Sequence, residues 1–162
     1  MAIDRFIAQS KSLRFAVLAG LKLTDSKEYA EALIRRIDFL EANGIKVIVF
    51  VPHILLPFDI RRCFPRPLGQ VLADCTVPLS AREKINVGFR SVIEALRAQR
   101  PEVKVFDIND VFCNSTACSF KRDGMPLYRD KGNHLSEYGS IEVGKMFATW
   151  AKRNEPEILS PD

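Results

Sequence analysis

Short continuous apolar runs alternate along this chain with longer stretches of helical spacing. Residues 13–19 read Leu-Arg-Phe-Ala-Val-Leu-Ala and end at Gly20, and residues 45–51 are almost entirely β-branched or aromatic. Runs of this length bounded by glycine or proline are typical of strands covered on both faces. A third such run occupies residues 103–108. The pattern therefore predicts three strands of a buried sheet.

Helical periodicity fills the intervals between these runs. Asp25 with Glu28 predicts a capping box at the start of one helix, and Gly44 stands where a left-handed residue would end it. Residues 80–83 predict a second capping box, and a last helix is expected to begin at Ser136. The residues expected to face the core share helical spacing; they are Tyr29, Leu33, Ile37 and Leu40, then Ile85, Phe89, Val92, Ile93 and Leu96, then Val143, Met146, Phe147 and Trp150.

The order strand, helix, strand, helix, strand, helix predicts an α/β fold with a parallel sheet flanked by helices, whose sites form at the carboxyl ends of the strands. Residues 52–78 contain five prolines and are expected to be a long loop. Residues 112–125 suggest an irregular turn or a short hairpin, and residues 4–10 a short helix. We expect residues 1–155 to form one domain and residues 156–162 a tail.

Composition is that of an ordinary globular domain, with 162 residues, 47% hydrophobic and 27% charged. The net charge of +4 is spread over many segments, so the sequence gives no support for nucleic-acid binding. No apolar run approaches the roughly 18 to 20 residues that cross a bilayer. The first twelve residues include Asp4 and Arg5 and do not resemble a secretory signal.

Four cysteines lie in predicted loops or turns, at positions 63, 75, 113 and 118. An even number in loops favours disulfides, with three pairings open, and disulfides imply an oxidising compartment. A zinc site is the competing interpretation, but the chain has no C-x-x-C and only two histidines, so we expect no metal. An oxidising compartment conflicts with the missing signal, which leads us to expect that an N-terminal part is absent.

Asp130 and His134 lie just before the helix predicted to begin at Ser136. An aspartate that accepts from one imidazole nitrogen fixes the tautomer and leaves the other nitrogen to take a proton from a serine. An aspartate and a histidine in this arrangement are suited to catalysis of acyl transfer. The alternative is that both are ordinary surface or capping residues of a loop.

Tyr128-Arg-Asp130 followed by His134-Leu-Ser and then Gly139 resembles the last signature block of SGNH hydrolases. The version it resembles is the domain fused to acyltransferase-3 membrane proteins, which O-acetylate cell-surface polysaccharides. The strand ending in Val-Pro, the cysteines and Gly-Met-Pro-Leu-Tyr-Arg-Asp follow the order of that family, so the resemblance covers about residues 13–150.

The resemblance implies a flavodoxin-like three-layer α/β/α fold with a parallel sheet. It implies His134 as general base and Asp130 as its orienting carboxylate, without a cofactor, and it favours the disulfides Cys63–Cys75 and Cys113–Cys118. The implied partners are a polysaccharide or sugar acceptor and an acyl donor reached through a membrane acyltransferase domain. The implied location is the periplasmic side of the inner membrane, as part of a longer protein.

Two features depart from the family pattern. Asp130 precedes the histidine by four residues instead of three, with Lys131 at the usual place, and Asp123 is a less favoured substitute. The chain also has no Gly-Asp-Ser and no Gly-x-Ser-x-Gly, which leaves the nucleophile unassigned. Ser115, Ser136 and Ser140 are better interpreted as turn, cap and helix residues, and Gly20 is at best a backbone oxyanion donor.

We therefore expect a domain that lacks its N-terminal strand, with the serine outside this chain and little activity in the chain alone. The alternative is a non-catalytic module of the same fold that binds a glycan or a partner.

Several further residues have a functional and a structural interpretation. His53 follows a predicted strand and could belong to a site, although a packed or solvated loop histidine is the favoured interpretation. Arg61, Arg62 and Arg66 could clamp an anionic sugar or be solvated or paired with carboxylates. Tyr128 could line a cleft or pack under the loop.

Overall fold

The computed structural model describes residues 2–10, 12–65, 67, 71 and 75–160, so Arg66 lies outside the described residues. Its elements in chain order are α1 (Ala2–Gln9), β1 (Phe15–Leu18), α2 (Lys27–Ala42), β2 (Lys46–Phe50), η1 (Ile60–Cys63), β3 (Thr76–Pro78), α3 (Ser80–Gly88), α4 (Arg90–Gln99), β4 (Lys104–Phe106), η2 (Ile108–Val111), β5 (Ala117–Ser119), β6 (Lys121–Arg122), β7 (Met125–Pro126), α5 (Glu137–Asn154) and η3 (Pro156–Leu159).

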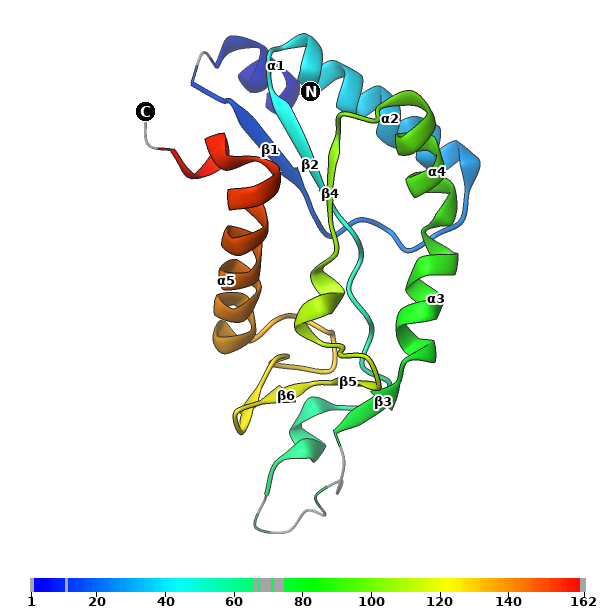
Figure 1. Cartoon of the computed structure of the whole chain (residues 1–162), viewed down its shortest axis with the longest axis vertical. Helices are drawn as coiled ribbons and strands as arrows, with labels where there is room; N and C mark the ends of the chain where they lie inside the picture. Colours follow the sequence, from blue (N-terminus) through cyan, green and yellow to red (C-terminus); the bar gives the residue numbers. More distant parts are fainter. Residues whose placement is uncertain (1, 11, 66, 68–70, 72–74, 161–162) are drawn as a thin grey trace.

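The three predicted strands form a parallel sheet in the order β1-β2-β4. Figure 1 shows α5 on one side of this sheet and α2 and α4 on the other, which confirms a mixed α/β fold with helices against a parallel sheet. Val47, Ile48 and Val49 of β2 are buried because the central strand is covered on both faces.

The predicted inner stripe of α5 packs against the sheet. The Phe106 ring of β4 lies 5.2 Å from Phe147 and 5.4 Å from Trp150, measured between ring centroids. Phe147 also lies 5.2 Å from Phe50 of β2. These aromatic contacts assign Phe147 and Trp150 to the interface between α5 and the sheet.

The predicted capping box of Asp25 is wrong. Ser26 is the N-cap of α2 and accepts from the Tyr29 amide at 3.2 Å. The Asp25 carboxylate instead accepts from the amide of Ser91 at 2.8 Å and from its hydroxyl at 2.7 Å. Asp25 thus caps the first turn of α4, a helix far along the chain.

The second predicted helix is also different, because it is divided in two at Phe89. The backbone leaves the helical region there, with φ −123° and ψ 12°. Gly88 packs closely on Leu23, to whose Cδ1 an added Cβ would be 3.0 Å, and the Phe89 ring is buried. The predicted box at Ser80 is absent too, since Leu79 is the N-cap and makes no side-chain capping bond.

Gly44 ends α2 as predicted. Its φ is +75°, its amide donates to Glu41 at 2.9 Å, and the Ile45 amide donates to Leu40 at 3.1 Å. This pair of bonds is a Schellman motif, in which a left-handed residue favours glycine.

Two small antiparallel ladders, β3–β5 and β6–β7, lie beyond the carboxyl ends of the sheet strands (Figure 1). Asp123 and Gly124 join β6 to β7 with φ +50° and +78°, as a two-residue hairpin turn requires.

Disulfides join Cys63 to Cys75 and Cys113 to Cys118, which confirms the favoured pairing. Both bridges lie in the irregular part of the domain, and all four cysteines are buried.

The C-terminal segment from Pro156 forms the short helix η3. Lys46 at the start of β2 lies 2.7 Å from Glu157 and 3.0 Å from Glu155, measured between Nζ and the carboxylate oxygens. Arg14 donates to the carbonyl of Ser160 at 3.3 Å. These contacts place η3 at the amino ends of β1 and β2.

The start of α5 is held against the preceding loop. Ser136 is the N-cap, as predicted, and its Oγ accepts from the Gly139 amide at 2.9 Å while it donates to the Pro126 carbonyl at 2.5 Å. Gly139 lies so close to Leu127 that an added Cβ would be 2.1 Å from its carbonyl oxygen. Only glycine fits at this approach.

We predict that Gly139→Ala destabilises the fold by about 1–3 kcal/mol or more, because the new methyl group collides with a backbone oxygen. Gly144→Ala in the same helix is the matched control. A Cβ there has no neighbour within 4 Å, so this change should stabilise by about 0.5–1 kcal/mol through helix propensity. Urea unfolding checks both, and equal effects would contradict the close approach at Gly139.

We predict that both disulfides form and contribute unequally to stability. Cys63→Ala with Cys75→Ala opens a loop of sequence separation 12 and should cost about 3 kcal/mol, whereas Cys113→Ala with Cys118→Ala should cost about 2 kcal/mol, since loop-closure entropy grows with loop length. Urea unfolding gives the two losses, and thiol titration of the denatured, unreduced wild type should find no free cysteine. A larger loss at the shorter loop would contradict the entropic argument.

Candidate functional site

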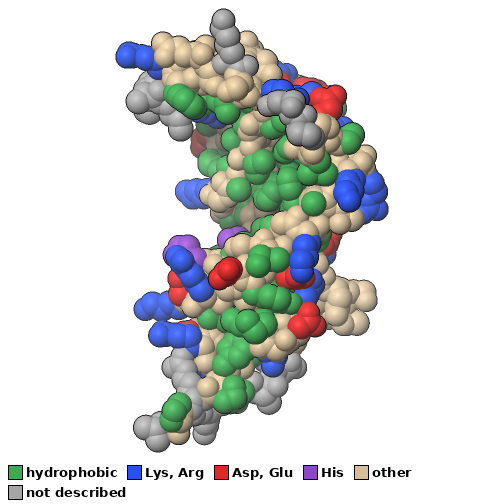
Figure 2. All heavy atoms as spheres, turned by 90° about the vertical axis from the view of Figure 1, so that its left-hand side faces the viewer, with side chains coloured by type: hydrophobic (Ala, Val, Ile, Leu, Met, Phe, Trp, Pro, Cys, Tyr) green, Lys and Arg blue, Asp and Glu red, His purple; other side chains and the backbone are tan. Residues whose placement is uncertain are grey.

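The two histidines lie close together on one face of the molecule, beside a hollow in its outline (Figure 2). One of them follows a strand of the sheet, and the other lies on a loop that contacts the same segment. His53 lies after β2, and His134 lies in the loop between β7 and α5. Sites of open α/β sheets form at this edge.

Asp130 and His134 form a pair. The Nδ1 atom of His134 lies 2.9 Å from Oδ2 and 3.1 Å from Oδ1 of Asp130. A carboxylate at this distance favours the proton on Nδ1, which leaves Nε2 with a free lone pair. The side chain of His134 is 65% exposed. Groups that do not belong to the described residues can therefore reach the lone pair on Nε2.

The Asp130 carboxylate is oriented by the backbone of its own loop. Oδ1 accepts from the amide of Gly132 at 2.8 Å and from the amide of His134 at 3.3 Å. The hydrogen bond from the His134 ring is the main cause that lowers the pKa of Asp130, and the two amides add to it. The four-residue spacing therefore still brings the carboxylate to the imidazole.

Asn133 supports the loop between these two residues. Its φ is +62°, a conformation that asparagine tolerates better than most residues. Its Oδ1 accepts from the Leu56 amide at 2.5 Å, and its carbonyl oxygen lies 3.1 Å from Nε2 of His53. The segment after β2 thus contacts the His134 loop through the side-chain amide and the carbonyl group of Asn133.

Asn109 ties the segment after β2 to the end of β4. It is the buried polar residue of the described core, at 1% exposure. Its Oδ1 accepts from the Ile54 amide at 2.8 Å, and its Nδ2 donates to the Pro52 carbonyl at 2.9 Å and to Asp107 at 2.8 Å. Sequence reasoning missed Asn109 and Asn133, since no local pattern marks a long-range amide contact.

Tyr128 packs under the loop, the second of its two interpretations. The ring is fully buried and stacks on Phe112 with centroids 5.1 Å apart. Its hydroxyl donates to the Ile54 carbonyl at 2.6 Å, and burial raises its pKa. Tyr128 therefore supports the same segment that Asn109 and Asn133 hold.

The other candidate residues lie outside the pair. Asp123 accepts from the Tyr138 hydroxyl at 2.9 Å and does not reach His134. Arg61 is paired with Asp59, in agreement with its structural interpretation. Within the described ranges, no serine hydroxyl is hydrogen-bonded to His134, and Ser136 is occupied as a cap.

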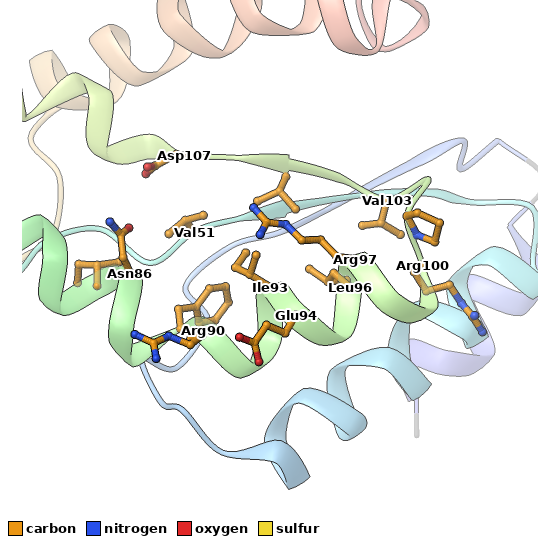
Figure 3. Close-up of a pocket in the computed structure, with 14 residues that line it drawn as sticks. Val51, Asn86, Arg90, Ile93, Glu94, Leu96, Arg97, Arg100, Val103 and Asp107 are labelled. Carbon is orange, nitrogen blue, oxygen red and sulfur yellow. The ribbon is translucent and has the colours of Figure 1, made fainter.

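A pocket of about 610 Å³ lies between α4 and β4, and its lining contains neither His134 nor Asp130. Figure 3 shows an apolar floor that includes Val51 and Ile93, with Arg97 extending across the groove. Among the residues that the structure describes, no three His, Cys, Asp or Glu side chains are grouped as metal ligands would be.

Comparison with family models matches residues 3–149 to the SGNH domain fused to AT3 domains. The chain belongs to this family. Comparisons with curated proteins and with solved structures find no match. The family assignment links this SGNH domain to membrane acyltransferases. None of the helices described in this SGNH domain is long and apolar enough to cross a bilayer.

The partly buried imidazole of His53 predicts a pH dependence of stability for this SGNH domain. Burial is the main cause that lowers the pKa of His53 below its ordinary value of 6.5, and the nearby His134 adds to it. The fold thus favours neutral His53, so its contribution is present above pH 6.5 and is lost as the pH falls from there through the folded pKa.

Proton NMR titration of the ring should give His53 a pKa below 6.5. Thermal unfolding between pH 7.5 and 5 should show a smaller loss of stability for His53→Gln than for the wild type, because glutamine does not titrate. A His53 pKa at or above 6.5 would contradict the burial argument.

Proposed function

We propose that this chain is part of an SGNH-type O-acyltransferase or esterase domain that transfers acetyl groups to hydroxyls of cell-surface polysaccharides. The observation that carries the proposal is the pair of His134 and Asp130, with 2.9 Å between Nδ1 and Oδ2. The family assignment supports it, because domains of this family are fused to AT3 domains. The proposed fold is the flavodoxin-like three-layer arrangement, completed by a strand outside residues 1–155, with residues 156–162 appended.

In the proposed reaction, a serine supplied from outside this chain gives its hydroxyl proton to Nε2 of His134. The serine oxygen attacks the carbonyl carbon of the acyl donor, and Nε2 returns the proton to the leaving group. A sugar hydroxyl then gives its proton to Nε2 and attacks the acyl-serine, and the serine oxygen regains the proton as it leaves. Asp130 holds the ring and stabilises the imidazolium in both steps.

The compartment proposed for this reaction is the periplasmic side of the inner membrane. Two disulfides, Cys63–Cys75 and Cys113–Cys118, support an oxidising environment. The acyl donor would reach the site through the membrane acyltransferase domain of the longer protein.

The first test is to read the coding DNA upstream of Met1 in all frames. Apolar spans followed by a Gly-Asp-Ser segment would support the proposal. A stop codon and an unrelated gene would overturn it in favour of a stand-alone module.

In the protein that carries the serine, we predict that His134→Ala and Asp130→Asn lower polysaccharide O-acetylation, the latter by about 10⁴-fold, because asparagine favours the wrong imidazole tautomer. Asp123→Asn is the matched control. Its carboxylate contacts Tyr138, and an asparagine oxygen can still accept there, so acetylation should be unchanged. Mass spectrometry of the released acetyl esters measures all three, and full activity of His134→Ala would refute the assignment.

A second candidate is a non-catalytic module that binds a glycan. The observation that favours it is that His134 makes no hydrogen bond to a serine in the described part of the chain. Calorimetric binding of the isolated chain to the polysaccharide, with acetylation unaffected by His134→Ala, would favour this candidate.

A further inference from the structure

We propose that His53 is a positioning residue that holds the imidazole of His134 in place through the peptide bond between Asn133 and His134. The inference rests on the proposed function, because it assigns a second histidine to the same site. It concerns a residue that no motif of the sequence marks.

The contact between His53 and the loop is directional. Nε2 of His53 lies 3.1 Å from the carbonyl oxygen of Asn133. A carbonyl oxygen can only accept, so His53 must carry a proton on Nε2 and donate it. In neutral His53 the proton is therefore on Nε2. A protonated His53 would donate from the same atom, so the contact is kept in both states.

The peptide bond that His53 holds is the one that carries His134. Its oxygen accepts from His53, and its nitrogen, the amide of His134, donates to Oδ1 of Asp130 at 3.3 Å. The peptide plane is therefore held from both sides. The Cα of His134 lies in this plane, so the two bonds fix the point from which its side chain starts, at a distance from which Nδ1 reaches both oxygens of Asp130.

His53 is itself held by the layer beneath it. Its ring lies 5.6 Å from Tyr128 and 6.4 Å from Phe112, measured between centroids. Tyr128 is fully buried and donates to the Ile54 carbonyl, one residue along the chain from His53. A ring with little freedom can define the position of a loop, which a solvated surface histidine cannot do.

The arrangement also separates the roles of the two histidines. Nε2 of His53 is occupied by Asn133, whereas Nε2 of His134 makes no hydrogen bond to any residue that the structure describes. Only His134 of the two has a carboxylate on one ring nitrogen and an unoccupied nitrogen opposite it among the described residues, so we place proton transfer there and let His53 act through it.

The test is the ¹⁵N spectrum of the imidazoles at a pH where both rings are neutral. The chain contains two histidines, so substituting one assigns the other. In the wild type, His53 should carry its proton on Nε2 and His134 on Nδ1. A wild-type His53 protonated on Nδ1 with Nε2 bare would overturn the proposal without any variant.

Two variants test the coupling. His53→Phe keeps a ring but removes the donor, and the Nδ1 and Nε2 shifts of His134 should move toward a common average as its tautomers mix. His53→Gln keeps a donor at nearly the same place and should restore the single tautomer. Unchanged His134 shifts in a folded His53→Phe protein would refute the coupling. If His53→Phe does not fold, His53→Asn, whose amide is too short to reach, takes its place.

In the protein that carries the serine, His53→Phe should lower kcat by about 10²-fold with little change in KM, the effect of misplacing a reacting group, and His53→Gln should recover most of it. Loss of activity in His134→Ala with normal kcat in His53→Phe would refute this inference alone. Mixed His134 tautomers in His53→Phe together with full activity in His134→Ala would refute the proposed function and leave the structural coupling standing.

Discussion

A single buried amide, Asn109, determines how the segment after β2 leaves the sheet. An amide inside an apolar core is costly unless its donors and acceptor are paired, and here they are paired with Pro52, Ile54 and Asp107. The carboxyl ends of β2 and β4 are thereby joined through side-chain bonds where the main-chain ladder has ended. The path of residues 52–56, and with it the place of His53, depends on this pairing.

The Asp130–His134 pair is built on that segment and not on the sheet directly. The hydroxyl of the buried Tyr128 donates to the Ile54 carbonyl, and the side chain of Asn133 in the loop accepts from the Leu56 amide. The pair itself is exposed, so a water-screened ion pair would contribute little to stability. Its geometry comes instead from the backbone amides of Gly132 and His134, which bind the carboxylate, and from the buried residues that support the loop.

The local sequence was sufficient to predict those elements whose formation depends on neighbouring residues in the chain. The apolar run at β2, the cap at Ser136 and the left-handed Gly44 depend on neighbours within a few residues, and the structure has them as predicted. Asp25 could not be interpreted in this way, because its partner Ser91 is 66 positions away in the sequence. The break at Phe89 has the same origin, since Leu23 packs against Gly88 only in the folded chain. At the site, the pairing of Asp130 with His134 was predicted from the motif that contains them, although their spacing departs from the family pattern. Asn109 and Asn133 act across the fold and were not predicted.

The placement of η3 has a practical consequence for work with this domain. The contacts of Lys46 with Glu155 and Glu157 hold the C-terminal segment at the amino ends of the strands, the opposite end of the sheet from the two histidines. An affinity tag, dye or surface tether attached beyond Ser160 therefore starts away from the site. The domain can be immobilised by that end with the exposed His134 left open to solution.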